Sequence, residues 1–228
     1  MRLPITPAST LQRALRDEIV ARYRGGRVLV GVDGRDGAGK TVFADALASV
    51  FRETGRAVFR ASLDDFHRPR SERYARGRSR PEGHYLDSYD YPTFRRVLVE
   101  PFLAGGDVDD TGFQLRAFDL HHDAPAEAAW ETGPRDAHLI VDGLFLNRPE
   151  LRDLWHWTVF LDVPAAVAAA RMAARDGTDP DPDAASNTRY REGYELYVRQ
   201  SDPRAAASAV VDNTDHAAPV RQAPGAGR

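Results

Sequence analysis

The chain has 228 residues, of which 42 % are hydrophobic, and its formal net charge at pH 7 is −3. Length and composition predict a domain with a core of its own, and the small net charge argues against broad nucleic-acid binding. No apolar run approaches the roughly 20 residues of a membrane-spanning helix. There is no cysteine, which excludes disulfides and cysteine metal sites. We therefore expect a cytoplasmic protein without a membrane partner.

Hydrophobic periodicity predicts helices and strands in alternation along the chain. The expected helices span 8–24, 92–103, 149–154, 164–175 and 187–200, and a further helix follows a glycine-rich turn at 34–39. The expected strands span 27–32, 57–63, 138–141, 157–161 and 209–211. This order implies an α/β fold with a mostly parallel, five-stranded sheet.

The remaining segments lack a clear period. Residues 67–91 are rich in arginine, tyrosine, glycine and proline and predict a long loop, whereas 113–120 alternates enough to form one arm of a small hairpin. An acidic loop at 176–183 is expected to act as a lid. We divide the chain into an N-terminal helix at 1–25, a main domain at 26–213 and a disordered tail at 214–228.

Lys40 is the only lysine among the 31 lysine and arginine residues. A position that keeps lysine in such a chain indicates a need for a compact ammonium group. Lys40 lies in a Gly-x-x-x-x-Gly-Lys-Thr motif between a predicted strand and a predicted helix, as a phosphate-binding P-loop requires. Its backbone would surround a nucleotide's phosphates. The expected nucleotide-binding residues are Gly34, Arg35, Asp36, Gly37, Ala38, Gly39, Lys40, Thr41 and Val42.

Two aspartates that end predicted strands complete this chemistry. Asp142 follows an apolar strand, so we expect its carboxylate and the Thr41 hydroxyl to hold Mg²⁺. Asp64 and Asp65 end another strand at the same edge of the sheet, where ligands of such sheets bind. A kinase needs a carboxylate near the acceptor hydroxyl as a base or orienter, and we favour Asp64 because it is nearer to the strand end.

The class of P-loop protein follows partly by exclusion. A GTPase switch needs an Asn-Lys-x-Asp motif, and Lys40 is already used by the P-loop. A motor ATPase usually works in a larger assembly, whereas this chain carries no obvious partner domain. A kinase acting on a small molecule is the best fit. The alternative is a regulator that binds ATP and a ligand but transfers nothing.

The order of these motifs resembles the uridine kinase and phosphoribulokinase-related family. The resemblance runs from Arg27 to Asn213 and rests on the P-loop, 64–67, 89–92, Asp142-Gly143 and 162–175. It implies the three-layer P-loop NTPase fold, ATP with Mg²⁺, and the 5′-hydroxyl of a nucleoside such as uridine or cytidine as acceptor. It further implies that Asp64 activates that hydroxyl. The implied substrate-binding residues are Phe66, His67, Tyr89, Asp90, His121 and His122, with Asp90 on the ribose.

The predicted helix at 164–175 carries Arg171 and Arg175 one turn apart. The resemblance implies that both arginines neutralise phosphate charge during transfer, and a solvated helix face is the plainer interpretation. The lid at 176–183 departs from the family because it holds four aspartates and no arginine. Pantothenate, glycerate or a sugar phosphate therefore stay open as acceptors, and so does homo-oligomer formation.

Overall fold

The structure is a computed structural model that describes residues 2–105 and 112–223. Six strands form one sheet in the order β2-β5-β1-β6-β7-β8. These strands are β1 (Val28–Gly34), β2 (Val58–Ser62), β5 (His138–Asp142), β6 (Trp157–Asp162), β7 (Ala209–Asp212) and β8 (Val220–Arg221). All pairings are parallel except that of β8 with β7. The predicted parallel α/β fold is confirmed.

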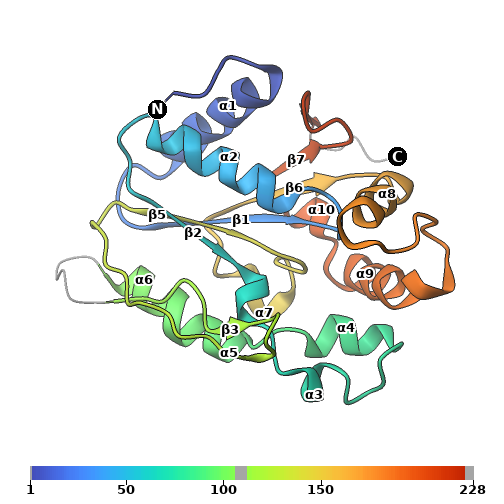
Figure 1. Cartoon of the computed structure of the whole chain (residues 1–228). Coiled ribbons are helices and arrows are strands. Elements are labelled where there is room, and N and C mark those ends of the chain that lie inside the picture. The colour runs from blue at the N-terminus through green and yellow to red at the C-terminus, as the bar shows by residue number, and fades with distance from the viewer. Residues whose placement is uncertain (1, 106–111, 224–228) are drawn as a thin grey trace.

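Helices cover both faces of the sheet and create two cores (Figure 1). Val28, Val30 and Val32 of β1 point toward the face covered by α1 (Pro7–Arg22) and α2 (Lys40–Arg52). Leu29 of the same strand belongs to the opposite core, because neighbouring side chains of a strand point to opposite faces. The helices near that second face are α4 (Pro81–Asp87), α5 (Tyr91–Phe94), α6 (Glu100–Ala104), α7 (Pro149–Arg152) and α9 (Thr188–Ser201).

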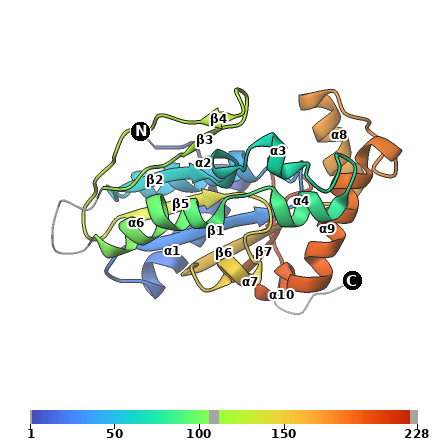
Figure 2. The ribbon, with the colours of Figure 1, turned by 90° about the horizontal axis from the view of Figure 1, so that it is seen from below.

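The shorter elements gather at one end of the sheet. Figure 2 shows α3 (Arg70–Arg73), α4, α8 (Ala165–Asp176) and α9 together beyond the carboxyl ends of the parallel strands. The hairpin of β3 (Phe118–Asp119) and β4 (Ala124–Pro125) lies near α3 in the same view. The other short elements are η1 (Leu63–Phe66), η2 (Arg95–Val99), η3 (Ala185–Asn187) and α10 (Pro203–Ala206). No helix of the described residues is long and apolar enough to cross a membrane.

Three expectations differ from the structure. The sheet has six strands rather than five, because residues 220–221 add β8 at the edge next to β7. Residues 214–223 were predicted to begin a disordered tail but contain this strand, while 224–228 lie outside the described residues. The predicted loop at 67–91 contains α3 and α4, and α4 packs against α9. Contacts with a distant helix therefore stabilise a segment without strong local periodicity.

Candidate active site

The P-loop connects β1 to α2 through three glycines with positive φ. They are Gly34 at 152°, Gly37 at 74° and Gly39 at 85°. At Gly37 a Cβ atom would lie 2.3 Å from the backbone oxygen of Ala168 in α8, so only glycine fits there. Val42 of the predicted set remains 68 % exposed at the start of α2.

Lys40, Thr41 and Asp142 come together at the mouth of the P-loop. The Lys40 ammonium donates to the backbone oxygen of Arg35 at 2.9 Å, so the side chain folds back over the loop. The Thr41 hydroxyl donates to Asp142 Oδ2 at 2.7 Å, although the two residues are 101 positions apart. The contact brings together the hydroxyl and the carboxylate that the sequence predicts as Mg²⁺ ligands.

Arg60 of β2 holds the other carboxylate oxygen of Asp142. Its guanidinium donates to Asp142 Oδ1 at 2.7 Å, to the backbone oxygen of Ile140 at 2.7 Å and to Asp45 Oδ1 at 2.9 Å. Asp142 is almost fully buried, so this pairing fixes its orientation and leaves Oδ2 directed at Thr41. The sequence analysis did not identify Arg60, because arginine is common throughout the chain.

A second buried carboxylate lies immediately before the P-loop. Asp33 is completely buried and accepts hydrogen bonds from the Gly34 backbone at 2.8 Å, from Asn147 Nδ2 at 2.7 Å and from the Tyr197 hydroxyl. Burial raises the pKa of Asp33, and these donors only partly oppose that rise. The network ties the end of β1 to α9 and to the loop after β5, so it positions the P-loop against α9.

A pocket of about 190 Å³ adjoins the P-loop and contains Asp64. Asp64 Oδ1 accepts a hydrogen bond from the Tyr89 hydroxyl at 3.0 Å, and the ring of His67 lies 4.6 Å from that of Tyr89. Burial raises the pKa of Tyr89 well above its usual value, and the charge of Asp64 adds to the rise, so the phenol stays a donor. The pocket thus joins the predicted residues Asp36, Asp64, His67 and Tyr89.

Four predicted substrate residues are not among the described residues that line this pocket. Phe66 is buried in the core, with its ring 5.1 Å from that of Phe94. Asp90 caps α5 by accepting from the Thr93 backbone at 3.0 Å. His121 and His122 are exposed in the β3–β4 turn, where His122 Nδ1 lies 2.8 Å from Asp119 Oδ2.

The hairpin instead reaches the pocket through Leu120. Leu120 immediately precedes the two histidines, so the register of the hairpin turn decides which of these side chains lines the pocket. An apolar side chain in this place offers contact area but no hydrogen bond to a ligand.

The two predicted lid arginines have different environments. Arg171 donates to the backbone oxygens of Asn213 at 3.0 Å and Thr214 at 2.8 Å, and to that of Gly37 at 3.4 Å. It therefore braces α8 against the P-loop and the end of β7. Arg175 pairs with Asp176 at 2.6 Å and is largely exposed. The structure thus favours a positioning role for Arg171.

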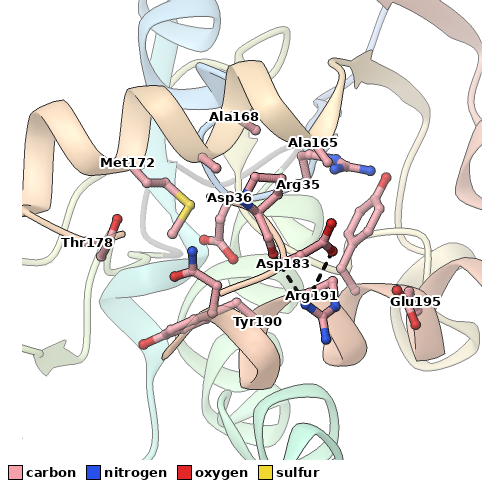
Figure 3. Close-up of a pocket in the computed structure, with 14 residues that line it drawn as sticks. Arg35, Asp36, Ala165, Ala168, Met172, Thr178, Asp183, Tyr190, Arg191 and Glu195 are labelled. Carbon is pink, nitrogen blue, oxygen red and sulfur yellow. Dashed lines mark hydrogen bonds and ion pairs between the residues drawn. The ribbon is translucent and has the colours of Figure 1, made fainter. Parts of the chain in front are cut away.

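Another pocket, of about 290 Å³, lies between the P-loop, α8 and α9 (Figure 3). Its lining includes Ala168 and Met172 from α8, and Arg35 and Asp36 reach it from the P-loop. Arg35 also stacks over Tyr194, with its guanidinium carbon 4.6 Å from the ring centre. Asp36 and Tyr190 line both this pocket and the one around Asp64, so they form the partition between them.

Residues from α4 and α9 also line the pocket around Asp64. Burial raises the pKa of Asp36, but His84 and Lys40 more than offset that rise. Arg189 donates to the backbone oxygens of Arg73, Gly77, Arg78 and Arg80, so it holds the arginine-rich segment in place. No local motif marks His84 or Arg189.

The residues at the P-loop fit a nucleoside triphosphate with Mg²⁺. The glycine cradle at Gly37 leaves no room for a side chain, and Thr41 and Asp142 offer the oxygen ligands that Mg²⁺ prefers. No group of three or more metal-binding side chains occurs within residues 2–105 and 112–223.

Comparisons with known proteins agree with this architecture. The chain is 27 % identical over 157 residues to a uridine kinase from Brevibacillus brevis, which covers 67 % of each protein. No family model matches the chain.

Two solved structures superimpose on most of the chain. A possible uridine kinase from Bacillus stearothermophilus gives a TM-score of 0.67 at 23 % identity over 88 % of this chain and 97 % of that one. A putative fructose transport system kinase from Silicibacter sp. TM1040 gives 0.61 at 25 % identity over 85 % and 95 %. The predicted resemblance to uridine kinase-like P-loop kinases and the predicted fold are confirmed.

Proposed function

We propose that this chain transfers the terminal phosphoryl group of ATP to a hydroxyl group of a small molecule. One observation carries the proposal: Asp36 of the P-loop lines the same pocket as Asp64, so the phosphate-binding loop and the acceptor carboxylate share one cavity. The similarity to a uridine kinase supports the same reaction class. Mg²⁺ would neutralise phosphate charge when bound.

Each residue has a defined task in this reaction. The P-loop backbone and Lys40 bind the phosphates, and Thr41 and Asp142 hold the metal. Asp64 accepts a hydrogen bond from the acceptor hydroxyl and orients or deprotonates it. Tyr89 donates to Asp64 at 3.0 Å and keeps its carboxylate directed into the pocket.

The 5′-hydroxyl of uridine or cytidine is the first acceptor we propose, because the curated relative is a uridine kinase. A smaller acceptor such as glycerate, pantothenate or a sugar phosphate is the second. Two features of the pocket favour the second candidate. The pocket measures about 190 Å³, whereas pockets for drug-sized ligands measure roughly 300–1,000 Å³. Leu120 lines it where a histidine was expected.

ADP production with ATP, Mg²⁺ and each of uridine, cytidine, pantothenate, glycerate and ribulose 5-phosphate tests the proposal. Lys40→Ala should lower turnover on the order of 100-fold or more, and Lys40→Arg should not restore it, because a planar guanidinium does not replace the compact ammonium. A protein that binds ATP but forms no ADP above background with any of these acceptors would be a regulator, and the kinase proposal would fail.

Asp64→Asn tests the acceptor carboxylate, and its neighbour provides a matched control. Turnover should fall about 100-fold or more while ATP binding is kept. Asp65→Asn should keep most activity, because Asp65 does not line the described pocket. Loss of ATP binding in Asp64→Asn would instead assign that residue to the metal or the fold.

A further inference from the structure

The acceptor pocket is lined by a buried histidine to which the proposed reaction gives no role. His84 of α4 is 6 % exposed, and its Nε2 has no hydrogen-bond partner among the described residues. Its nearest charged neighbour is Asp36 Oδ2 at 3.8 Å, which exceeds hydrogen-bond distance. Buried polar atoms are nearly always paired, so an unpaired atom that lines a pocket indicates a ligand contact.

The His84 ring is held in place and cannot turn to find another partner. Its edge contacts the rings of Phe145 at 5.2 Å and Tyr190 at 5.0 Å. On the α9 side, a Cβ atom at Gly193 would lie 2.8 Å from His84 Cδ2, so the glycine permits this close packing. The Ser88 hydroxyl lies 3.5 Å from Nδ1 at the other end of the ring. The His84 ring therefore keeps a fixed orientation in the lining of the pocket.

The distance between His84 Nε2 and Asp36 Oδ2 suits one bridging oxygen. An oxygen at a normal hydrogen-bond distance of about 2.8 Å from both atoms would make an angle of roughly 85° at that oxygen. Only a group that can both accept and donate satisfies the two sides, because the imidazole N–H donates and the carboxylate accepts. A hydroxyl group has this property, whereas a carbonyl, an ammonium or a methyl group does not.

We propose that His84 and Asp36 bind a second hydroxyl of the acceptor, distinct from the hydroxyl that Asp64 presents for phosphorylation. The acceptor is accordingly a compound with at least two hydroxyl groups, such as a sugar, a nucleoside or a hydroxy acid with a further hydroxyl. The inference rests on the proposed kinase function. It adds a specificity contact that comes from α4 and from the P-loop itself.

Deoxy analogues measure this contact directly. Each accepted compound is compared with an analogue that lacks one non-reacting hydroxyl: uridine with 2′-deoxyuridine and 3′-deoxyuridine, and glycerate with 3-hydroxypropionate. In the unaltered protein, kcat/KM should fall about tenfold or more for the analogue without the bridging hydroxyl, as for other hydrogen bonds to charged groups. In His84→Phe the preference should shrink to less than about threefold, and His84→Gln should restore part of it.

His84→Phe should fold, because a ring of similar shape keeps the contacts with Phe145 and Tyr190 and only the long 3.5 Å contact between Ser88 Oγ and Nδ1 is lost. The matched control is His138→Phe, which replaces another buried histidine with unpartnered ring nitrogens outside the pocket. That variant should keep the full preference.

Three results overturn the inference. An active enzyme that treats each parent and all its deoxy analogues alike shows that water alone fills the gap, and the kinase function would stand. An unchanged preference in His84→Phe removes His84 from recognition. The absence of ADP formation with every acceptor refutes the proposed function and this inference together.

Discussion

His138 should make folding stability depend on pH between about pH 4 and 6.5. It begins β5, is almost fully buried and packs at 4.7 Å from the Phe51 ring. Neither ring nitrogen has a hydrogen-bond partner among the described residues. Burial, assisted by the positive charge of Arg56, lowers the pKa of His138 to about 4 from its usual 6.5. The folded protein therefore keeps this imidazole neutral.

The lowered pKa fixes the sign and the size of the effect. Below pH 6.5 the unfolded chain binds a proton at this position and the folded chain does not, so acid favours unfolding. Stability from this group is fully present above pH 6.5 and declines until about pH 4. At about 1.4 kcal/mol per pH unit, the gap between the two pKa values corresponds to about 3 kcal/mol as an upper limit.

Urea unfolding followed by tryptophan fluorescence at pH 7 and pH 5 measures this dependence. In His138→Phe the loss of unfolding free energy between the two pH values should be smaller by about 2 kcal/mol, because the titrating group is gone. Comparison of the two proteins cancels the contributions of the other histidines and the carboxylates. Equal pH dependence in both would refute the conclusion that His138 is held neutral.

Two further substitutions test the construction of the P-loop and the metal site. Gly37→Ala should lose about 2 kcal/mol or more of stability and most ATP affinity, because the added Cβ would meet the backbone of Ala168. Gly55→Ala is the control, since Gly55 has a similar positive φ of +75° but open space around it. Equal losses of stability in urea unfolding of the two variants would contradict this explanation. Arg60→Met should lower the free energy of unfolding by about 3 kcal/mol, because it leaves the buried Asp142 without its ion-pair partner. Asp45→Asn removes only the exposed partner of Arg60 and should lower the free energy of unfolding by less than about 1 kcal/mol. Similar denaturation midpoints for the Arg60 and Asp45 variants would refute the claim that Arg60 pairs structurally with Asp142.

The sequence was sufficient for the parts of the fold that depend on local periodicity. The five predicted strands appear with ends shifted by at most two residues, because buried β-strands form continuous apolar runs that polar residues end. The P-loop was equally clear, since its glycines are required by backbone conformation rather than by distant contacts. Asp142 was found for a related reason, since it directly follows such a run.

Distant contacts account for what the sequence analysis missed. The segment at 67–91 was interpreted as a loop, yet α4 within it is stabilised by packing against α9, about 110 residues later. His84 joins the pocket only through this packing.

The direction of individual side chains was the second feature that the sequence did not predict. Phe66 follows two aspartates and was expected to face the substrate, but the helical turn of η1 directs it into the core beside Phe94. In the β3–β4 turn a shift of one residue exchanges Leu120 for His121. Such choices depend on a rotation of about 120° per residue in a 3₁₀ turn or on the register of the hairpin turn. Composition and spacing do not determine either.

The P-loop depends on residues that the ribosome adds more than 150 positions after it. Asn213 Nδ2 donates to the Ala38 backbone oxygen at 2.8 Å across 175 positions, and Tyr197 reaches Asp33 across 164. The phosphate-binding loop is therefore synthesised well before Tyr197 and Asn213, and their hydrogen bonds to it form only after those residues have been added. A chain that stops before β7 would contain the whole motif and still lack the Asn213 contact that holds it.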